Sequence, residues 1–263
     1  MTEAQNPLTP GAVPLVETSR NLPTPERALA IGAHPDDVDF GCGGTLAKWA
    51  AAGCEVSVLV CTDGSKGTWD PQADEAELIE RRKVEQRAAA EALGATGEVV
   101  FLGHPDGELA STLTEREQVT LWIRRLRPTV VLGHDPWKRY RLHPDHRHAG
   151  WLTTDGVVAA RDPKFFPHQG VPHHRPDRLL LWEADAPDHV EDVTGWLDTK
   201  YAALLAHESQ FETTMLEQTV EGTVGADSPE MAAFRARVEA KLTAAGDAAG
   251  VTHAEVFKLI DDL

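Results

Sequence analysis

Short apolar runs alternate with longer segments of helical pattern along the first half of the chain. Four runs of five to seven residues predict buried strands at 27–33, 55–61, 98–103 and 129–133. The segments between them predict helices at 45–52, 74–93 and 114–126. This alternation is typical of the α/β class, with a mostly parallel sheet and helices on both faces.

The second half of the chain is less regular. It predicts helices at 145–160, 190–207 and 228–245, a strand at 178–183, and a Pro- and His-rich loop at 162–177. Neither an internal repeat nor a clear linker interrupts the sequence, so we expect a single α/β domain over residues 25–263. Residues 1–24 are rich in Pro, Thr and Asn, which predicts an extended N-terminal arm.

The net charge limits the kinds of partner that the protein can bind, and the cysteine content indicates its cellular compartment. The 263 residues include 25 Lys and Arg against 42 Asp and Glu, a net charge of −17 with histidine neutral. This argues against nucleic acid or an anionic membrane as the main partner, since both attract basic faces. The 3 cysteines are too few for a disulfide framework, which favours a reducing, cytoplasmic compartment. No apolar run approaches the roughly 18 residues of a membrane span, and we expect no signal peptide.

Two similar polar motifs follow two of the predicted strands. His-Pro-Asp-Asp at 34–37 follows the first strand, and His-Pro-Asp-His at 143–146 comes after the fourth. In a parallel sheet both loops open at the same edge, where their side chains can converge. Two histidines and a carboxylate form a common catalytic zinc set, and a further carboxylate could act as a base. A metal-dependent hydrolase is therefore one interpretation of the pattern.

Polar turns at strand ends explain the same residues equally well. His-Pro-Asp is a plausible turn by itself, and the tripeptide recurs at 104–106, after the third strand. Spacing alone leaves the metal site and the plain turns as open alternatives. The histidines at 168, 173 and 174 are poor candidates for a metal site because their loop offers no rigid element.

Two other classes of protein fit the predicted sheet. A nucleotide-binding dehydrogenase would need a Gly-rich turn after the first strand, but residues 32–44 lack the G-x-G-x-x-G pattern and carry aspartates that repel phosphate. A binding protein without catalytic activity would have the same scaffold. Stoichiometric metal binding and release of an amine would distinguish the three classes.

Several segments together resemble the PIG-L (LmbE-like) N-deacetylase family. They are 33–37 with 43–46, 62–64, 82–85 before Gly94, 143–147, and 200–204 with His207, Ser209 and Gln210. Within the family, TDGSKGTWD at 62–70 and HDPWKRYRLHPDHR at 134–147 resemble the diacetylchitobiose deacetylase group. The likeness covers about residues 27–210 and implies a Rossmann-like sheet.

The resemblance implies a role for each residue of the two motifs. His34, Asp37 and His146 match the ligands of one divalent ion per chain, usually Zn²⁺. Asp36 matches the general base. His143 matches the histidine that stabilises the oxyanion or protonates the leaving amine, as a cation whose pKa a carboxylate raises. Asp145 would orient a catalytic histidine from behind.

Other family positions concern the substrate. Arg82 and Asp106 match residues that hold the sugar, and His253 could reach an active site across a subunit interface or simply cap a surface helix. The implied activity is removal of the N-acetyl group from an N-acetylglucosamine-type amino sugar or its conjugate, releasing acetate. The alternative is an amidase that cleaves a larger acyl group, for example from a sugar–thiol conjugate. The implied partners are a small amino-sugar substrate and further copies of the chain in a homo-oligomer.

Overall fold

The computed structural model describes residues 18–216, 225 and 228–263. Its strands are β1 (Ser19–Arg20), β2 (Arg27–Gly32), β3 (Glu55–Thr62), β4 (Val99–His104), β5 (Val130–His134), β6 (Arg178–Trp182), β7 (His189–Asp192) and β8 (Ala254–Ile260). Its α-helices are α1 (Asp37–Ala51), α2 (Glu75–Ala92), α3 (Leu113–Leu126), α4 (Pro144–Arg161), α5 (Leu197–Leu205) and α6 (Pro229–Ala249). Short turns of 3₁₀-helix (Pro167–Gln169, Glu208–Gln210) and π-helix (Phe211–Met215) complete the elements.

One sheet of eight strands connects the described elements, in the order β1-β7-β8-β6-β5-β2-β3-β4. Neighbouring strands are parallel except where β8 pairs with β6 and β7. β2 lies between β3 and β5, with Ile31 opposite Leu59 on one side and Gly133 on the other. The predicted mostly parallel α/β sheet is confirmed.

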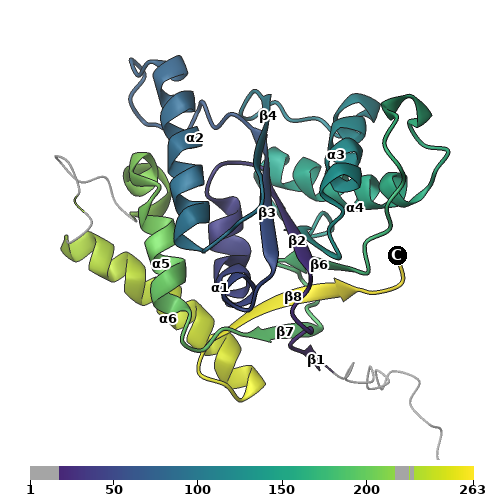
Figure 1. The fold of residues 1–263 in the computed structure, drawn as a ribbon. Coiled ribbons are helices and arrows are strands. Elements are labelled where there is room, and N and C mark those ends of the chain that lie inside the picture. Colours follow the sequence, from purple (N-terminus) through teal and green to yellow (C-terminus); the bar gives the residue numbers. More distant parts are fainter. Residues whose placement is uncertain (1–17, 217–224, 226–227) are drawn as a thin grey trace, which may run out of the picture.

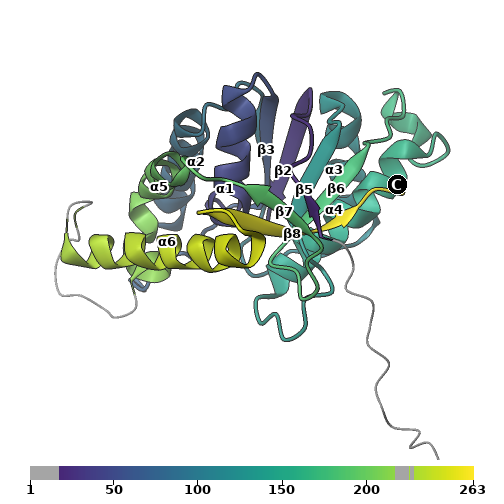
Figure 2. The same ribbon diagram turned by 90° about the horizontal axis from the view of Figure 1, so that it is seen from below.

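Helices cover both faces of the sheet, as predicted. α1, α2 and α5 lie on one side, and α3 and α4 lie on the other (Figures 1 and 2). Along β2, Ala28 and Ala30 pack into the first layer, while Leu29 and Ile31 pack into the second. Successive side chains of a strand point to opposite faces, so a run that is apolar at every position must be buried on both.

Local signals set most of the helix ends. The Asp74 carboxylate accepts the first free N–H groups of α2, and Thr112 and Glu115 form a capping box at the start of α3. α6 starts with Ser228 as its N-cap and ends before Gly250, whose φ of 72° favours glycine.

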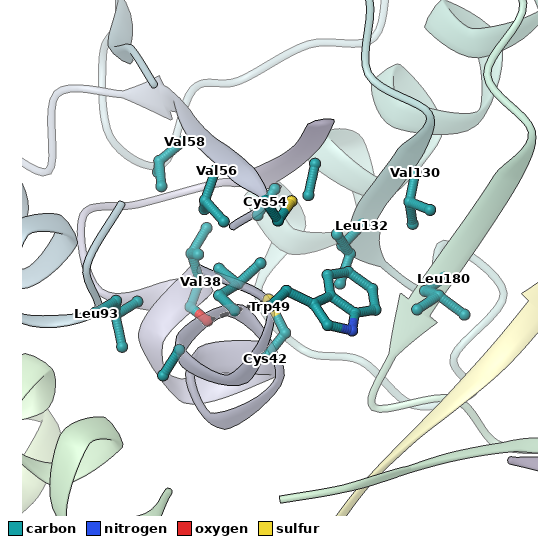
Figure 3. Packing of buried hydrophobic residues seen from close by; sticks show 14 of the residues in the cluster. Val38, Cys42, Trp49, Cys54, Val56, Val58, Leu93, Val130, Leu132 and Leu180 are labelled. Carbon is teal, nitrogen blue, oxygen red and sulfur yellow. Dashed lines mark hydrogen bonds between the residues drawn. The ribbon is translucent and has the colours of Figure 1, made fainter. Parts of the chain in front are cut away.

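The first helix begins earlier than the sequence predicts. Residues 34–39 read as a polar turn, yet α1 starts at Asp37 and runs to Ala51 with a kink at Cys42. The polar residues of its first turn hid the helical pattern, because Asp37 faces the site and Asp39 is buried against Gln86 and His207. Beyond the kink, Trp49 packs on the same layer as Val38 and Leu132 (Figure 3).

The sheet edge formed by β7 and β8 is also a correction. The predicted helix at 190–207 is wrong in its first residues, which form β7, and its helical part is shorter, at Leu197–Leu205. The sequence analysis assigned no strand at 254–260, where β8 lies. The last helix continues to Ala249 rather than 245.

Part of the predicted N-terminal arm belongs to the sheet. Residues 1–17 lie outside the described part of the chain, but Ser19 and Arg20 form β1, which pairs in parallel with β7. Among the described residues, no helix is both long enough and apolar enough to cross a membrane.

Candidate active site

The two polar motifs meet at the carboxyl edge of the sheet. β2 pairs with β5, so the turn after β2 and the chain that follows β5 open side by side. α1 starts at Asp37, the last residue of the first motif, and α4 starts at Pro144, within the second. The convergence predicted from the sequence is confirmed.

Four donor atoms of three residues from the two motifs lie at similar separations, because Asp37 meets the two imidazoles through different oxygens. The Nδ1 atom of His34 is 3.3 Å from Oδ2 of Asp37 and 3.2 Å from Nε2 of His146, and Nε2 of His146 is 3.2 Å from Oδ1 of Asp37. With metal–ligand bonds of about 2.0–2.2 Å, the edges of a tetrahedron are about 3.3–3.6 Å long. The two histidines and the carboxylate therefore fit a divalent ion.

The charges around His34 also favour a cation. Its Nε2 atom lies 3.1 Å from Asp106 and 3.2 Å from Asp145, on the ring edge opposite Nδ1. Burial alone would lower the pKa of His34, but hydrogen bonds to Asp106, Asp145 and Asp37 raise it well above its ordinary value. A raised pKa favours protons on both ring nitrogens, so an ion would have to displace the Nδ1 proton while Nε2–H keeps its contacts with the two carboxylates.

Asp145 anchors this arrangement from the first turn of α4. It is fully buried, and besides His34 it accepts the backbone N–H groups of Gly107 and Leu109. The family resemblance implied that Asp145 orients a histidine. The structure shows that its histidine partner is His34, which it contacts across the two motifs.

His134 is a site residue that the sequence analysis missed as a candidate. It is the last residue of β5, its Nδ1 accepts a hydrogen bond of 3.0 Å from the Trp182 indole, and its Nε2 lies 3.2 Å from Oδ2 of Asp37. Burial lowers the pKa of His134, which therefore stays neutral beside the Asp37 carboxylate. Its place at the end of a strand, directly before Asp135, was the available signal.

His146 is held by ring stacking and by a contact at its Nδ1 atom. Its ring stacks with His134 at 4.5 Å and with His143 at 4.9 Å between centroids. Its Nδ1 atom lies 2.8 Å from the Arg141 guanidinium, which also binds Glu183. An imidazole that binds an ion through Nε2 carries its proton on Nδ1, so Arg141 must move away from Nδ1 when an ion binds.

Asp36 is the neighbour of Asp37 in the chain, but its carboxylate contacts Arg82 rather than the two histidines. Its backbone has a φ of 106° and a ψ of −30°, and its Oδ2 atom lies 3.4 Å from the Arg82 guanidinium. Burial raises the pKa of Asp36 to about 6, against the opposing charge of Arg82. A carboxylate with a pKa near neutrality is well suited to take up and return a proton.

Arg82 is more constrained than a free substrate ligand. It is 3% exposed, and it donates hydrogen bonds to the carbonyls of Gly64 and Pro35. A Cβ atom on Gly64 would lie 2.7 Å from the guanidinium, so glycine at 64 makes room for Arg82. Arg82 lines the cavity, and its predicted contact with the sugar stays a prediction.

His143 is placed as predicted, but its charge state is not. It is the N-cap of α4, where its Nδ1 accepts the N–H of Asp145 at 3.3 Å. The sequence analysis expected a carboxylate to raise its pKa. Burial and the positive charges of His34 and His146 instead lower the pKa of His143 and outweigh Asp145. A lowered pKa favours the neutral imidazole over the cation that the sequence analysis expected.

A cavity of about 530 Å³ opens above these residues. The motif residues and Asp106 form its floor. Its walls include Lys66, Trp69, Gln210, Thr213 and Lys241. His253 does not line this cavity; its Nε2 lies 4.0 Å from Glu239 on α6. Within one copy of the chain, the structure does not bring His253 to the site.

Comparisons with known proteins place the chain in a family. Residues 29–157 match the family described as PIG-L, GlcNAc-PI de-N-acetylase. A diacetylchitobiose deacetylase of Thermococcus kodakarensis is 36% identical over 195 residues, 73% of this chain and 73% of the relative. The chain belongs to the PIG-L family of deacetylases.

Other relatives show the range of the family. A 1D-myo-inositol 2-acetamido-2-deoxy-alpha-D-glucopyranoside deacetylase of Actinosynnema mirum is 35% identical, over 53% of this chain and 57% of the relative. The solved N,N'-diacetylchitobiose deacetylase of Pyrococcus horikoshii has a TM-score of 0.79 and 27% identity, covering 90% of this chain and 84% of that one.

A hydratase shares the fold as well. The 4-carboxy-2-hydroxymuconate hydratase GalB, from Pseudomonas putida, has a TM-score of 0.70 at 22% identity, covering 89% of this chain and 96% of that one. The fold alone therefore does not decide the reaction, and the side chains of the site have to.

Proposed function

We propose that this protein is a zinc-dependent N-deacetylase that removes the N-acetyl group from an N-acetylglucosamine-type amino sugar or its conjugate and releases acetate. The observation that carries the proposal is the joint placement of His34, Asp37 and His146 at mutual distances of 3.2–3.3 Å, with the carboxylate of Asp36 in the same cavity. The names of the relatives supply the substrate class.

The ligand residues in this proposal are His34, Asp37 and His146. A divalent ion held by them would lower the pKa of a water molecule to about 7 and polarise the amide carbonyl. Zinc suits this set of two nitrogen atoms and one carboxylate with a position left open.

The remaining residues handle protons and charge. Asp36 takes the proton of the attacking water and, with a pKa near 6, returns it to the leaving amine. His143 keeps Nδ1 occupied by the Asp145 N–H, so its Nε2–H is the donor available to the oxyanion. Asp145 holds His34, and Arg82 and Asp106 bind the sugar at the side of the cavity.

The experiment is a release assay on the purified chain. Metal is removed with a chelator, zinc is returned in steps, and acetate and free amine are measured with N-acetylglucosamine, its β-1,4-linked dimer and an inositol conjugate. We expect activity to rise to a maximum at one zinc per chain. If the chain binds one zinc but releases no amine from these sugars or from any N-acyl analogue, it is a binding protein rather than an enzyme.

An apolar side pocket supports the alternative activity on a larger acyl group. This pocket, of about 210 Å³, shares Phe40, Gly41, Glu183 and Lys241 with the main cavity. Its further walls are the apolar side chains Val238, Leu242, Ala245, Ala254 and Val256 of α6 and β8, together with the charged pair Lys200 and Glu255. A series of N-acyl glucosamines from acetyl to hexanoyl separates the two activities, because an acetyl-specific enzyme loses kcat/KM as the chain grows.

We also propose that the chain forms a homo-oligomer in the cytoplasm, with residues 25–263 as a single domain. Trp137, Tyr140 and Leu142, on the loop that leads into α4, are 55%, 92% and 90% exposed, which is unusual for large apolar side chains. In an oligomer this loop would be covered, and His253 could reach a neighbouring site. Light scattering of the wild type and of Leu142→Ser tests this. The three buried free cysteines suit a reducing compartment.

A further inference from the structure

The backbone of Asp36 is in a conformation that aspartate seldom adopts. Its φ of 106° lies in the left-handed region, which favours glycine, and the residue is 5% exposed. A strained residue of this kind persists only when its surroundings hold it in place. The strain lies between His34 and Asp37, where consecutive side chains must take different directions.

The Gln86 side chain holds the Asp36 backbone through a hydrogen bond. It lies on α2, is fully buried, and its Oε1 atom accepts the Asp36 N–H at 2.8 Å. Its Nε2 atom donates to Oδ2 of Asp39 at 3.0 Å. If the amide were turned over, its NH₂ would face the Asp36 N–H, donor against donor. Its oxygen would face the Asp39 carboxylate, acceptor against acceptor. The two partners therefore fix which way the Gln86 side chain points.

Asp39 is itself held by a histidine. Oδ2 of Asp39 lies 2.9 Å from Nε2 of His207, and both residues are fully buried. Asp39 is in the first turn of α1 and His207 follows α5, while Gln86 is on α2. The chain of contacts therefore connects three helices to one backbone N–H.

We propose that Gln86 is a positioning residue that holds the Asp36 carboxylate in its working direction through the Asp36 backbone. The inference rests on the proposed function, in which Asp36 handles the proton. Neither Gln86 nor its partners Asp39 and His207 is among the residues that line the cavity, so a direct role in binding the substrate is not required of them.

The test replaces Gln86 with methionine, which keeps the length of the side chain and removes both hydrogen bonds. We expect kcat to fall about 10- to 100-fold, because a reacting group displaced by about 1 Å costs that much. KM and the zinc dissociation constant should change less than about threefold. A kcat within about twofold of wild type overturns the proposal, and so does a loss of zinc affinity as large as the loss of kcat.

Glu85→Gln is the matched control. Glu85 is the preceding residue of α2, is 7% exposed, and binds Ser209 and Arg81 rather than Asp36. We expect Glu85→Gln to keep kcat within about twofold of wild type. An equal loss of kcat in both variants would mean that kcat reports general loosening of α2, against the proposal.

A structural measurement separates this inference from the proposed function. In a crystal structure of Gln86→Met, Asp36 should leave the left-handed region and its carboxylate should turn away from Arg82. Unchanged φ at Asp36 overturns the inference whatever the substrate is, whereas an inactive wild type overturns the proposed function. If Gln86→Met does not fold, Gln86→Asn, whose shorter side chain cannot span both partners, is measured in the same way with the same expectation.

Discussion

Two clusters of buried charge lie on either side of α1, and they are satisfied to very different degrees. The pocket cluster consists of His34, Asp36, Asp37, Asp106, Asp145 and His146, at the carboxyl edge of the parallel strands. The clamp consists of Lys48, Lys200, Glu191 and Glu255, where α1 meets the edge formed by β7 and β8. Both are buried or nearly so, and both join residues that are far apart in the sequence.

The clamp is saturated with partners. The Lys200 ammonium binds Glu255 at 2.7 Å and the carbonyls of Asp39 and Phe40 at 2.9 and 2.8 Å, which uses its three donors. Glu255 accepts the N–H groups of Gly44 and Thr45. These carbonyls and N–H groups flank the kink at Cys42, where the helix cannot pair them itself. The ion pair therefore repairs the break in α1.

The pocket cluster has an excess of negative charge. The nitrogen and oxygen atoms of His34, Asp37 and His146 that could bind a metal also lie close to one another in it. Four carboxylates surround two imidazoles there, and the only nearby cationic side chain that contacts Asp36 among the described residues is Arg82. A lysine that filled the same space, as in the clamp, would leave no place for an exchangeable cation. The difference teaches that a saturated buried ion pair is costly to break, whereas an unbalanced cluster of charges is available for chemistry.

Asp36→Asn tests the pocket cluster with the largest expected effect. The amide keeps the size of the side chain but cannot accept a proton from water, so kcat should fall about 10²- to 10⁴-fold. Zinc stoichiometry and the thermal midpoint should stay close to those of wild type. Near-normal turnover in the zinc-loaded variant would show that another group takes the proton.

Lys200→Met tests the clamp. Removal of one partner leaves Glu255 as an uncompensated buried charge, and we expect the free energy of unfolding to fall by about 3–5 kcal/mol. Urea denaturation of the zinc-free protein measures this. Lys83→Met is the control, since the pair of Lys83 with Glu80 is at the surface and contributes about 0–1 kcal/mol. Similar losses in the two variants would contradict the contrast between clamp and surface.

Asp145→Asn weakens the support of His34 without removing a ligand. The residue keeps its shape but loses its negative charge, and one oxygen becomes an NH₂ that cannot accept. That NH₂ then faces either Leu109 at Oδ1 or Gly107 and His34 at Oδ2. Loss of such a partner behind a metal ligand costs about 10- to 100-fold in metal affinity, measured here by competition with a chelator. Asp155→Asn, on the solvent side of the same helix α4, should leave zinc affinity unchanged.

His207→Gln has the smallest expected effect and appears in the pH dependence of stability. Burial lowers the pKa of His207, but the Asp39 carboxylate outweighs it and raises the pKa above 6.5. The folded state therefore binds this proton more tightly than the unfolded state, so the stabilisation is complete below about pH 6.5 and disappears as pH rises through the folded pKa. The difference in unfolding free energy between wild type and His207→Gln should shrink from pH 6 upward. A difference that grows with pH would show a neutral His207.

The parallel half of the sheet followed from local pattern, and the β7–β8 edge did not. β2, β3 and β5 are continuous apolar runs, because both of their faces are buried, and such runs are visible in the sequence. β7 is only four residues long and leads at once into α5, so helical periodicity concealed it. β8 follows α6 closely and is only partly buried over its second half, which gives a weaker signal than a continuous apolar run.

By itself, the sequence determined the α/β class, the two polar motifs and, through family resemblance, the set of candidate site residues. Tertiary structure alone decided that His134 lies beside Asp37, that Arg82 is tied to Pro35 and Gly64, and that burial lowers the pKa of His143. It also decided which distant side chains meet, as Gln86 does with Asp36 and Lys200 with Glu255. Strand and helix patterns arise from neighbours along the chain, whereas pKa values and hydrogen-bond partners depend on burial and on charges that only folding brings together.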